Sequence, residues 1–239
     1  MFKLIHKSTP GRIEIIDALR GLAILLMVVC HLAYDLVAEG IIPYNWLNNP
    51  PIDVLRMAFA LLFIVICGVS CSFSHSNLRR GLLICAAALV VTGATYLFDP
   101  TEYVKFGILH LLGVSVLIYA AARPVLDRIP AAVTLSLAPV LCAVTWPLMY
   151  QRFDVKWLWW LGIMPRHFVS SDYYPLLPYF FAFLFGTALG PIIKARKFPK
   201  WFYEFRCAPL AFCGRNTLWI YLIHQPLCIG LTYLILALK

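Results

Sequence analysis

The sequence predicts an all-α integral membrane protein, a bundle of about seven transmembrane helices. Of its 239 residues, 62% are hydrophobic and only 13% are charged, and the mean hydropathy is +0.82. A soluble domain carries about 45–50% apolar and 25% charged residues, so a soluble protein is excluded. The apolar residues also form continuous runs of about 20, the length that crosses a bilayer as a helix. These runs do not show the alternation of barrel strands.

The seven expected spans follow one another along the whole chain. They cover about residues 13–38, 52–74, 80–98, 105–122, 131–149, 174–193 and 208–238. The first and last are long enough to tilt or to extend past the hydrocarbon. The first is also too long for a signal peptide and lacks a small-residue cleavage site, so we expect a retained helix. Between the fifth and sixth spans, residues 156–165 include three tryptophans, which favours a short interfacial helix.

Charge and cysteine content narrow the class further. Fourteen of the 20 lysine and arginine residues lie at one set of helix ends, which predicts a cytoplasmic N-terminus and an outer C-terminus. With acidic residues included, the cytoplasmic side carries +10 and the outer side −1, so the net charge of +9 reflects topology and predicts no nucleic-acid partner. Six of the eight cysteines fall in apolar runs and no C-x-x-C pair exists. We therefore expect no disulfide framework and no metal site.

The first span carries four polar side chains on one face. At about 100° per residue, the eleven-residue step from Arg20 to His31 returns to within about 20° of the same direction, and Asp17 and Asp35 lie within about 40° of that face. Charges inside a membrane are costly and are therefore functional candidates. Asp17 and Arg20 could instead be an anchoring ion pair, and His31 a hydrogen-bond partner of a neighbouring helix. A carboxylate one turn from His31 also suits a general base and its orienting group.

Polar residues recur in three later segments. His110 lies three residues from Gly107 and from Gly113, which suits either a functional histidine or a close helix contact through small residues. Asp172 opens the sixth span, either at a cavity mouth or as an interfacial cap. Pro226 in the last span leaves one backbone carbonyl without its helix hydrogen bond. The same span is expected to contain the polar residues Arg215, Asn216, Tyr221, His224 and Gln225.

Four short motifs, in order, resemble those of transmembrane acyltransferases. They are Asp17-x-Leu-Arg20-Gly21-x-Ala-Ile with His31 eleven residues after Arg20, Phe106-Gly-Ile-Leu-His110-Leu-Leu-Gly113, Asp172-Tyr-Tyr-Pro-Leu-Leu-Pro178, and Gly214-Arg-Asn-Thr-Leu-Trp-Ile-Tyr-Leu-Ile-His224-Gln-Pro226. Together they are similar to bacterial proteins related to heparan-alpha-glucosaminide N-acetyltransferase, over about residues 12–236. The lysosomal branch places its key histidine after the first span, where this chain has none, so His31 follows the wider superfamily's spacing.

The resemblance implies a single acyltransferase domain, 1–239, in a bacterial inner membrane. It would transfer an acetyl or other acyl group from cytoplasmic acetyl-CoA, as co-substrate, to a sugar-like or lipid-linked amine or hydroxyl, and its assembly into a homo-oligomer is left open. His31 would act as a general base or transient acyl carrier. The other implied site residues are Asp35 and His110 at the catalytic centre, Arg20, Asp17, Arg215 and Asn216 toward CoA, and Asp172, His224 and Gln225 toward the acceptor.

The residues alone leave two other classes open. A polar stripe in a helix bundle also suits a carrier or flippase of a lipid-linked sugar, which would move its substrate without CoA. Intramembrane histidines could ligate b-type haem, and such a protein would show a Soret band. A retinal protein is excluded, because the last span has no lysine before Lys239 at its end.

Overall fold

The computed structural model describes residues 12–47 and 49–238, and its regular elements are helices. Within these residues, seven helices are long and apolar enough to cross a membrane, which confirms the expected all-α class of a multi-pass membrane protein. Three basic residues used in the charge count, Lys3, Lys7 and Lys239, lie outside the described residues. The elements are α1 (Glu14–Ala38), η2 (Tyr44–Trp46), α2 (Pro50–Ser70), α3 (Asn77–Phe98), α4 (Ile108–Leu126), α5 (Ala131–Thr145), η3 (Trp146–Tyr150), η4 (Trp159–Leu161), α6 (Leu176–Lys194), α7 (Lys200–Glu204), α8 (Ala208–Arg215) and α9 (Thr217–Ala237).

The structure differs from the sequence expectations at three places. The last apolar run is not one helix, because the chain turns at Asn216 and divides it into α8 and α9. The fifth run ends as the 3-10 helix η3, which contains Pro147. The interfacial helix expected at 156–165 reduces to the single 3-10 turn η4, which ends at Gly162 with a φ of 115°. Glycine adopts this left-handed backbone without steric cost.

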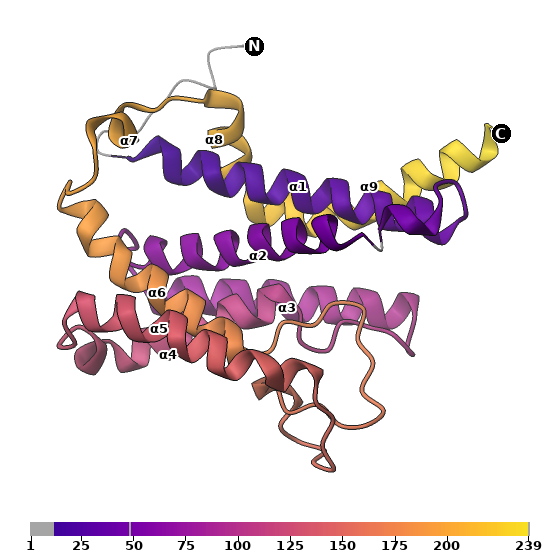
Figure 1. Ribbon diagram of the computed structural model, residues 1–239. Helices are drawn as coiled ribbons and strands as arrows, with labels where there is room; N and C mark the ends of the chain where they lie inside the picture. Colours follow the sequence, from indigo (N-terminus) through magenta and orange to yellow (C-terminus); the bar gives the residue numbers. More distant parts are fainter. Residues whose placement is uncertain (1–11, 48, 239) are drawn as a thin grey trace. The chain divides into compact units, whose positions relative to one another are not determined.

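The chain divides into two compact units, and the first contains both ends of the sequence. It comprises Met1–Phe63 and Phe198–Lys239, and so holds α1, most of α2, α7, α8 and α9. Here α1 lies along α8 and α9 (Figure 1). The Gly214 carbonyl accepts from Arg20 near the start of α1, whereas Gln225 bonds Asp35 near its end. Gly214 belongs to α8, and from there α9 runs in the same direction as α1, so α1 and α9 are parallel (Figure 1).

The second unit, Ile64–Lys197, contains the last turns of α2 and helices α3 to α6. Helices α3 and α4 run antiparallel, because Gly81 faces Leu117 and, further along α3, Cys85 faces Gly113. The end of α2 runs parallel to α6, since Gly68 meets Thr187 and Ser72 meets Gly190. Small residues let these backbones approach closely, which is the usual way in which helices pack in membranes.

Helix direction within each unit agrees with a chain that crosses a membrane back and forth. The first and seventh apolar helices, α1 and α9, are parallel, and so are the second and sixth, α2 and α6. The third and fourth, α3 and α4, are antiparallel. Helices whose order differs by an even number must run the same way if every connection crosses the membrane. The side on which each terminus lies stays a prediction.

Candidate functional site

The polar stripe of α1 faces α8 and α9, and its first part is an ion pair. Asp17 is buried, and its carboxylate lies between Arg12 and Arg20. Arg20 Nη1 donates to Asp17 Oδ1 at 3.0 Å and to the Gly214 carbonyl at 3.2 Å. Because the last carbonyls of a helix carry partial negative charge, this guanidinium also stabilises the end of α8. Asp17 and Arg20 therefore hold α1 against α8, in the anchoring role that was one sequence alternative.

Two glycines allow that contact. A Cβ atom on Gly214 would lie 2.7 Å from the Asp17 carbonyl carbon, and one on Gly21 would lie 2.8 Å from that of Leu210. Both neighbours are backbone atoms, which cannot rotate away as a side chain can. Helices α1 and α8 consequently touch backbone to backbone, and this closeness brings the Gly214 carbonyl within reach of Arg20.

Arg215 and Asn216 lie at the break between α8 and α9. Asn216 ends α8, because its side-chain Nδ2 donates to the Phe212 carbonyl at 2.9 Å and its backbone N–H bonds the same carbonyl at 3.2 Å. Local bonds of this kind let asparagine replace helical hydrogen bonds. Arg215 is the last residue of α8, half-buried and directly after Gly214. With Arg12, Arg20 and Arg206, which faces Glu14 at the start of α1, it gives this end of the first unit four guanidinium groups.

The second part of the stripe brings two histidines together. The ring of His31 on α1 meets the ring of His224 on α9, with centroids 4.8 Å apart and planes at 86°. His31 is partly exposed, whereas His224 is only 6% exposed. This pairing brings the polar stripe of α1 against the polar residues of α9.

Backbone carbonyls select the same tautomer for both rings. His31 Nδ1 lies 2.9 Å from the carbonyl of Met27, and His224 Nδ1 lies 2.5 Å from that of Tyr221. A carbonyl can only accept, so each Nδ1 carries the hydrogen of the neutral ring. Each Nε2 therefore keeps its lone pair. In His224 this atom is buried without a hydrogen-bond partner among the described residues.

Asp35 binds a partner other than the one expected from the sequence. Gln225 Nε2 on α9 donates to both of its carboxylate oxygens, at 3.1 and 3.2 Å. The Met27 carbonyl, not Asp35, holds the Nδ1 of His31. The group that orients His31 is therefore the Met27 carbonyl, and Asp35 does not accept its hydrogen bond. Asp35 fixes Gln225, whose Oε1 is buried without a partner among the described residues.

His110 lies in the second unit, at the start of α4. Its Nδ1 accepts from the N–H of Gly107 at 3.2 Å, so Nε2 carries the hydrogen and donates to Thr92 Oγ1 at 3.2 Å. The Thr92 hydroxyl in turn donates to the Val104 carbonyl at 2.8 Å. Both ring nitrogens are thus used, in contrast to His31. Gly107 precedes α4 as its N-cap and is not inside a helix, contrary to the expectation for this motif.

Asp172 also serves the start of α4. Its Oδ2 accepts from the N–H of Ile108 at 3.0 Å, where a carboxylate satisfies a free helix donor and meets the positive end of the helix dipole. In the same loop Tyr173 donates its hydroxyl to the Trp159 carbonyl at 2.6 Å, and burial raises the pKa of Tyr173. The interfacial cap, one of the two sequence alternatives for Asp172, describes this geometry, although the capped helix is α4 and not α6.

One comparison with known proteins identifies the family of the chain. Residues 12–226 match the family model of heparan-alpha-glucosaminide N-acetyltransferase, catalytic. The chain belongs to this N-acetyltransferase family. The searches of curated proteins and of solved structures gave no significant match. The match runs through both compact units and includes every candidate site residue named above.

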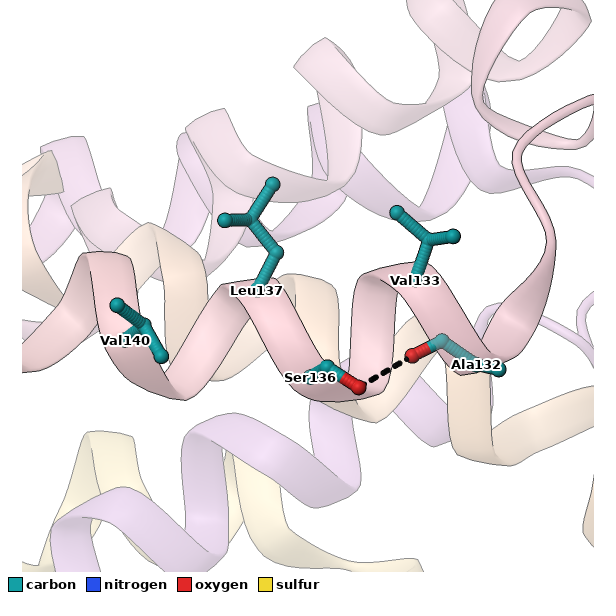
Figure 2. A pocket seen from close by; sticks show the side chains of 5 residues that line it. All are labelled: Ala132, Val133, Ser136, Leu137 and Val140. Carbon is teal, nitrogen blue, oxygen red and sulfur yellow. Dashed lines mark hydrogen bonds between the residues drawn. The ribbon is translucent and has the colours of Figure 1, made fainter.

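A surface hollow lies on the second unit of the chain. It runs along α5 and is lined by Ala132, Val133, Ser136, Leu137 and Val140 (Figure 2). Its hydroxyl group, on Ser136, donates to the Ala132 carbonyl of the same helix at 2.8 Å. An exposed apolar surface with its polar atom satisfied suits contact with lipid chains and offers no group for acyl transfer.

Sequence reasoning about the acetyltransferase missed the groups that hold its histidines. The carbonyl of Met27 lies one helical turn before His31, and that of Tyr221 lies three residues before His224. This i−3 or i−4 spacing is visible in the sequence. Thr92 lacks such a signal, because it meets His110 from another helix. In the part of the chain that the structure describes, no group of three or more His, Cys, Asp or Glu side chains is arranged to hold a metal ion.

Proposed function

We propose that the chain is an acetyl-CoA-dependent acetyltransferase of a bacterial inner membrane, with its N-terminus in the cytoplasm. It would act on a sugar-like or lipid-linked amine or hydroxyl. Both units would work as one domain, 1–239, which is supported by a family match extending through both. The observation that carries the proposal is the unprotonated Nε2 of His31, partly exposed beside a second histidine, on a helix that otherwise faces lipid and other helices.

His31 would act as the general base. As the acceptor nitrogen or oxygen attacks the thioester carbonyl, Nε2 takes its proton, the carbon–sulfur bond breaks, and the CoA thiolate then receives that proton. The products are the acetylated acceptor and CoA. The bond from Nδ1 to the Met27 carbonyl supports this role, since it fixes the ring and stabilises the imidazolium that forms.

The arginine-rich end of α1 and α8 would receive the phosphates of CoA. Arg215 and Arg12 have guanidinium groups near the surface, and phosphate binding by arginine is strong because the hydrogen bonds are charge-assisted. Arg20 and Asp17 would act by holding this end together, and Asn216 by ending α8 beside Arg215. From Arg20 to His31 the axial rise is about 16 Å, which leaves room for an extended pantetheine arm.

The acceptor would lie beside His224 and Gln225, whose buried Nε2 and Oε1 atoms both accept hydrogen bonds. An amine or hydroxyl donates such bonds, so it would satisfy groups whose burial is otherwise costly. His110 and Asp172, in the second unit, would act by holding the start of α4.

The test is acetyl transfer from labelled acetyl-CoA by the purified, detergent-solubilised full chain, with a panel of hexosamines and sugar alcohols. We expect His31→Gln to lower kcat about 10²–10⁴-fold, the usual contribution of a general base. Gly230→Ala is a suitable control, since a Cβ atom there meets no atom within 4 Å. Wild-type activity in His31→Gln would remove His31 from the centre.

The same preparation tests the two alternatives. A flippase would move a lipid-linked sugar across vesicles without acetyl-CoA. A bis-histidine haem protein would show a Soret band. Direct edge-to-face contact of His31 and His224 speaks against haem between them, because a porphyrin plane would have to separate the rings.

A further inference from the structure

Beside His31, the residues His224 and Gln225 each offer a buried hydrogen-bond acceptor that a single general base does not need. His224 is buried, with only 6% of the residue exposed, and its Nε2 has no partner among the described residues. Gln225 Oε1, the next residue along α9, is in the same state. Leaving such atoms unpaired costs free energy, so two adjacent unpaired acceptors on α9 point to a ligand that donates hydrogen bonds.

The surroundings of His224 suit a cationic donor. His224 itself contacts His31 of α1 and Tyr221 of its own helix, while Asp35 of α1 bonds the next residue, Gln225. Arg56 acts electrostatically on Cys30, the residue before His31, but it is paired with Asp53. Asp35 brings a carboxylate through its bonds to Gln225. A protonated amine would meet acceptors and one negative charge here. A carboxylate or phosphate ligand would be repelled by the Asp35 carboxylate and would face hydrogen-bond acceptors where it needs donors.

An ammonium group must lose two protons during N-acetylation. It has no lone pair, so one proton must leave before nitrogen can attack, and a second leaves as the carbon–nitrogen bond forms. A single histidine serves only one of these losses in each turnover. We propose that His224 removes the first proton from an acceptor that enters as its ammonium form, and that His31 removes the second.

The step balances without a further reactant. His224 Nε2 takes the first proton and later releases it to water. His31 Nε2 takes the second proton during attack and passes it to the CoA thiolate. The ammonium acceptor and acetyl-CoA thus give the amide, CoA thiol and one free proton. The assignment rests on the proposed function and deepens it, by adding a second proton-transfer residue and by fixing the charge state in which the acceptor enters.

The experiment compares two acceptors of the same size at pH 7, a primary alkylamine that is protonated and an alkoxyamine that is neutral. Full-length wild type, His224→Gln, His224→Phe and His31→Gln are assayed with both. We expect kcat/KM of both His224 variants to fall about 10²-fold with the alkylamine and to change little with the alkoxyamine. The kcat/KM of His31→Gln should fall by a similar factor with both acceptors. Both acceptors are assayed with the same preparation, so partial unfolding of a variant lowers both activities equally and leaves their ratio unchanged.

Thr232→Val is the matched control, because Thr232 is 3% exposed on the same helix and its Oγ1 is likewise buried without a partner among the described residues. Its acceptor ratio should equal that of the wild type. Equal losses with both acceptors in the His224 variants would overturn the role of His224, while activity of the wild type would still support the proposed function. Wild type that acetylates neither these two amines nor any hexosamine or sugar alcohol of the earlier panel would instead refute the proposed function.

Discussion

Replacing Gly214 by alanine tests whether the close contact of α1 and α8 positions the arginine-rich end of the site. A Cβ atom there would lie 2.7 Å from the Asp17 carbonyl carbon, while ordinary contact begins at 3.4 Å. The Cβ atom would also overlap the Asp17 carbonyl oxygen, which lies nearer still, so the helices would have to part by more than about 0.7 Å. A separation of that size stretches the 3.2 Å bond between Arg20 Nη1 and the Gly214 carbonyl beyond about 3.9 Å, which is longer than a hydrogen bond.

The expected cost combines two effects of this displacement. Overpacking of a close contact costs about 1–3 kcal/mol. Loss of the Arg20 bond adds about 1 kcal/mol, at the low end for a charged donor because the Arg20 side chain is 20% exposed. A total of about 2–4 kcal/mol corresponds to a melting temperature lower by about 5–15 °C for a chain of this size.

The assay is thermal unfolding of the detergent-solubilised protein, followed by intrinsic tryptophan fluorescence. Gly230→Ala is the matched control, since it also adds one methyl group to a glycine of the first unit but meets no atom within 4 Å. It should be neutral or slightly stabilising, because alanine favours helix over glycine by about 1 kcal/mol. Equal melting temperatures of Gly214→Ala and Gly230→Ala would refute the backbone contact between α1 and α8.

Two further predictions concern the second unit. Asp172→Ala should lower stability by about 0.5–2 kcal/mol by removing the acceptor of the Ile108 N–H, with Asp172→Asn retaining most of it; equal thermal melts of all three proteins would contradict the cap. Bonds from Thr101 lower the pKa of Asp99 from its ordinary 3.8, so its stabilisation is complete above about pH 4 and is lost as the pH falls through the lowered value. Acid melts of Asp99→Asn should show less loss over that range than the wild type, and identical acid dependence would speak against the lowered pKa.

The positions of the helices were predictable from the sequence, because long apolar runs mark the segments that cross the membrane. In a bilayer each backbone polar group must be satisfied within its own segment, so a long apolar run has little choice but to form a helix. The first run, expected at about 13–38, is α1 (Glu14–Ala38). Local side-chain chemistry overrode hydropathy at Asn216, whose amide bonds Phe212 and ends α8 within an apolar run. The tetrapeptide Gly214-Arg-Asn-Thr217 carries that signal in the sequence.

The face of the polar stripe was predictable, but the partners of its residues were not. Helical periodicity places Asp17, Arg20, His31 and Asp35 on one side of α1, and this side meets α8 and α9. Which side chain meets which depends on the register between two helices almost 200 residues apart in sequence. No local pattern contains that register. Asp35 therefore accepts hydrogen bonds from Gln225 and not from His31, whose Nδ1 bonds the Met27 carbonyl.

The three histidines differ in whether a ring nitrogen keeps a lone pair, and this difference distinguishes the candidate catalytic histidines from the structural one. His110 uses both ring nitrogens to tie the start of α4 to α3, so it is a rigid link. His31 and His224 each use only Nδ1, toward a carbonyl of their own helix, and keep Nε2 with a lone pair. A base must offer such a lone pair, and a fixed tautomer offers it without reorganisation during the reaction. Proton transfer is therefore expected at the contact of α1 and α9, where the motif histidines with an available nitrogen meet.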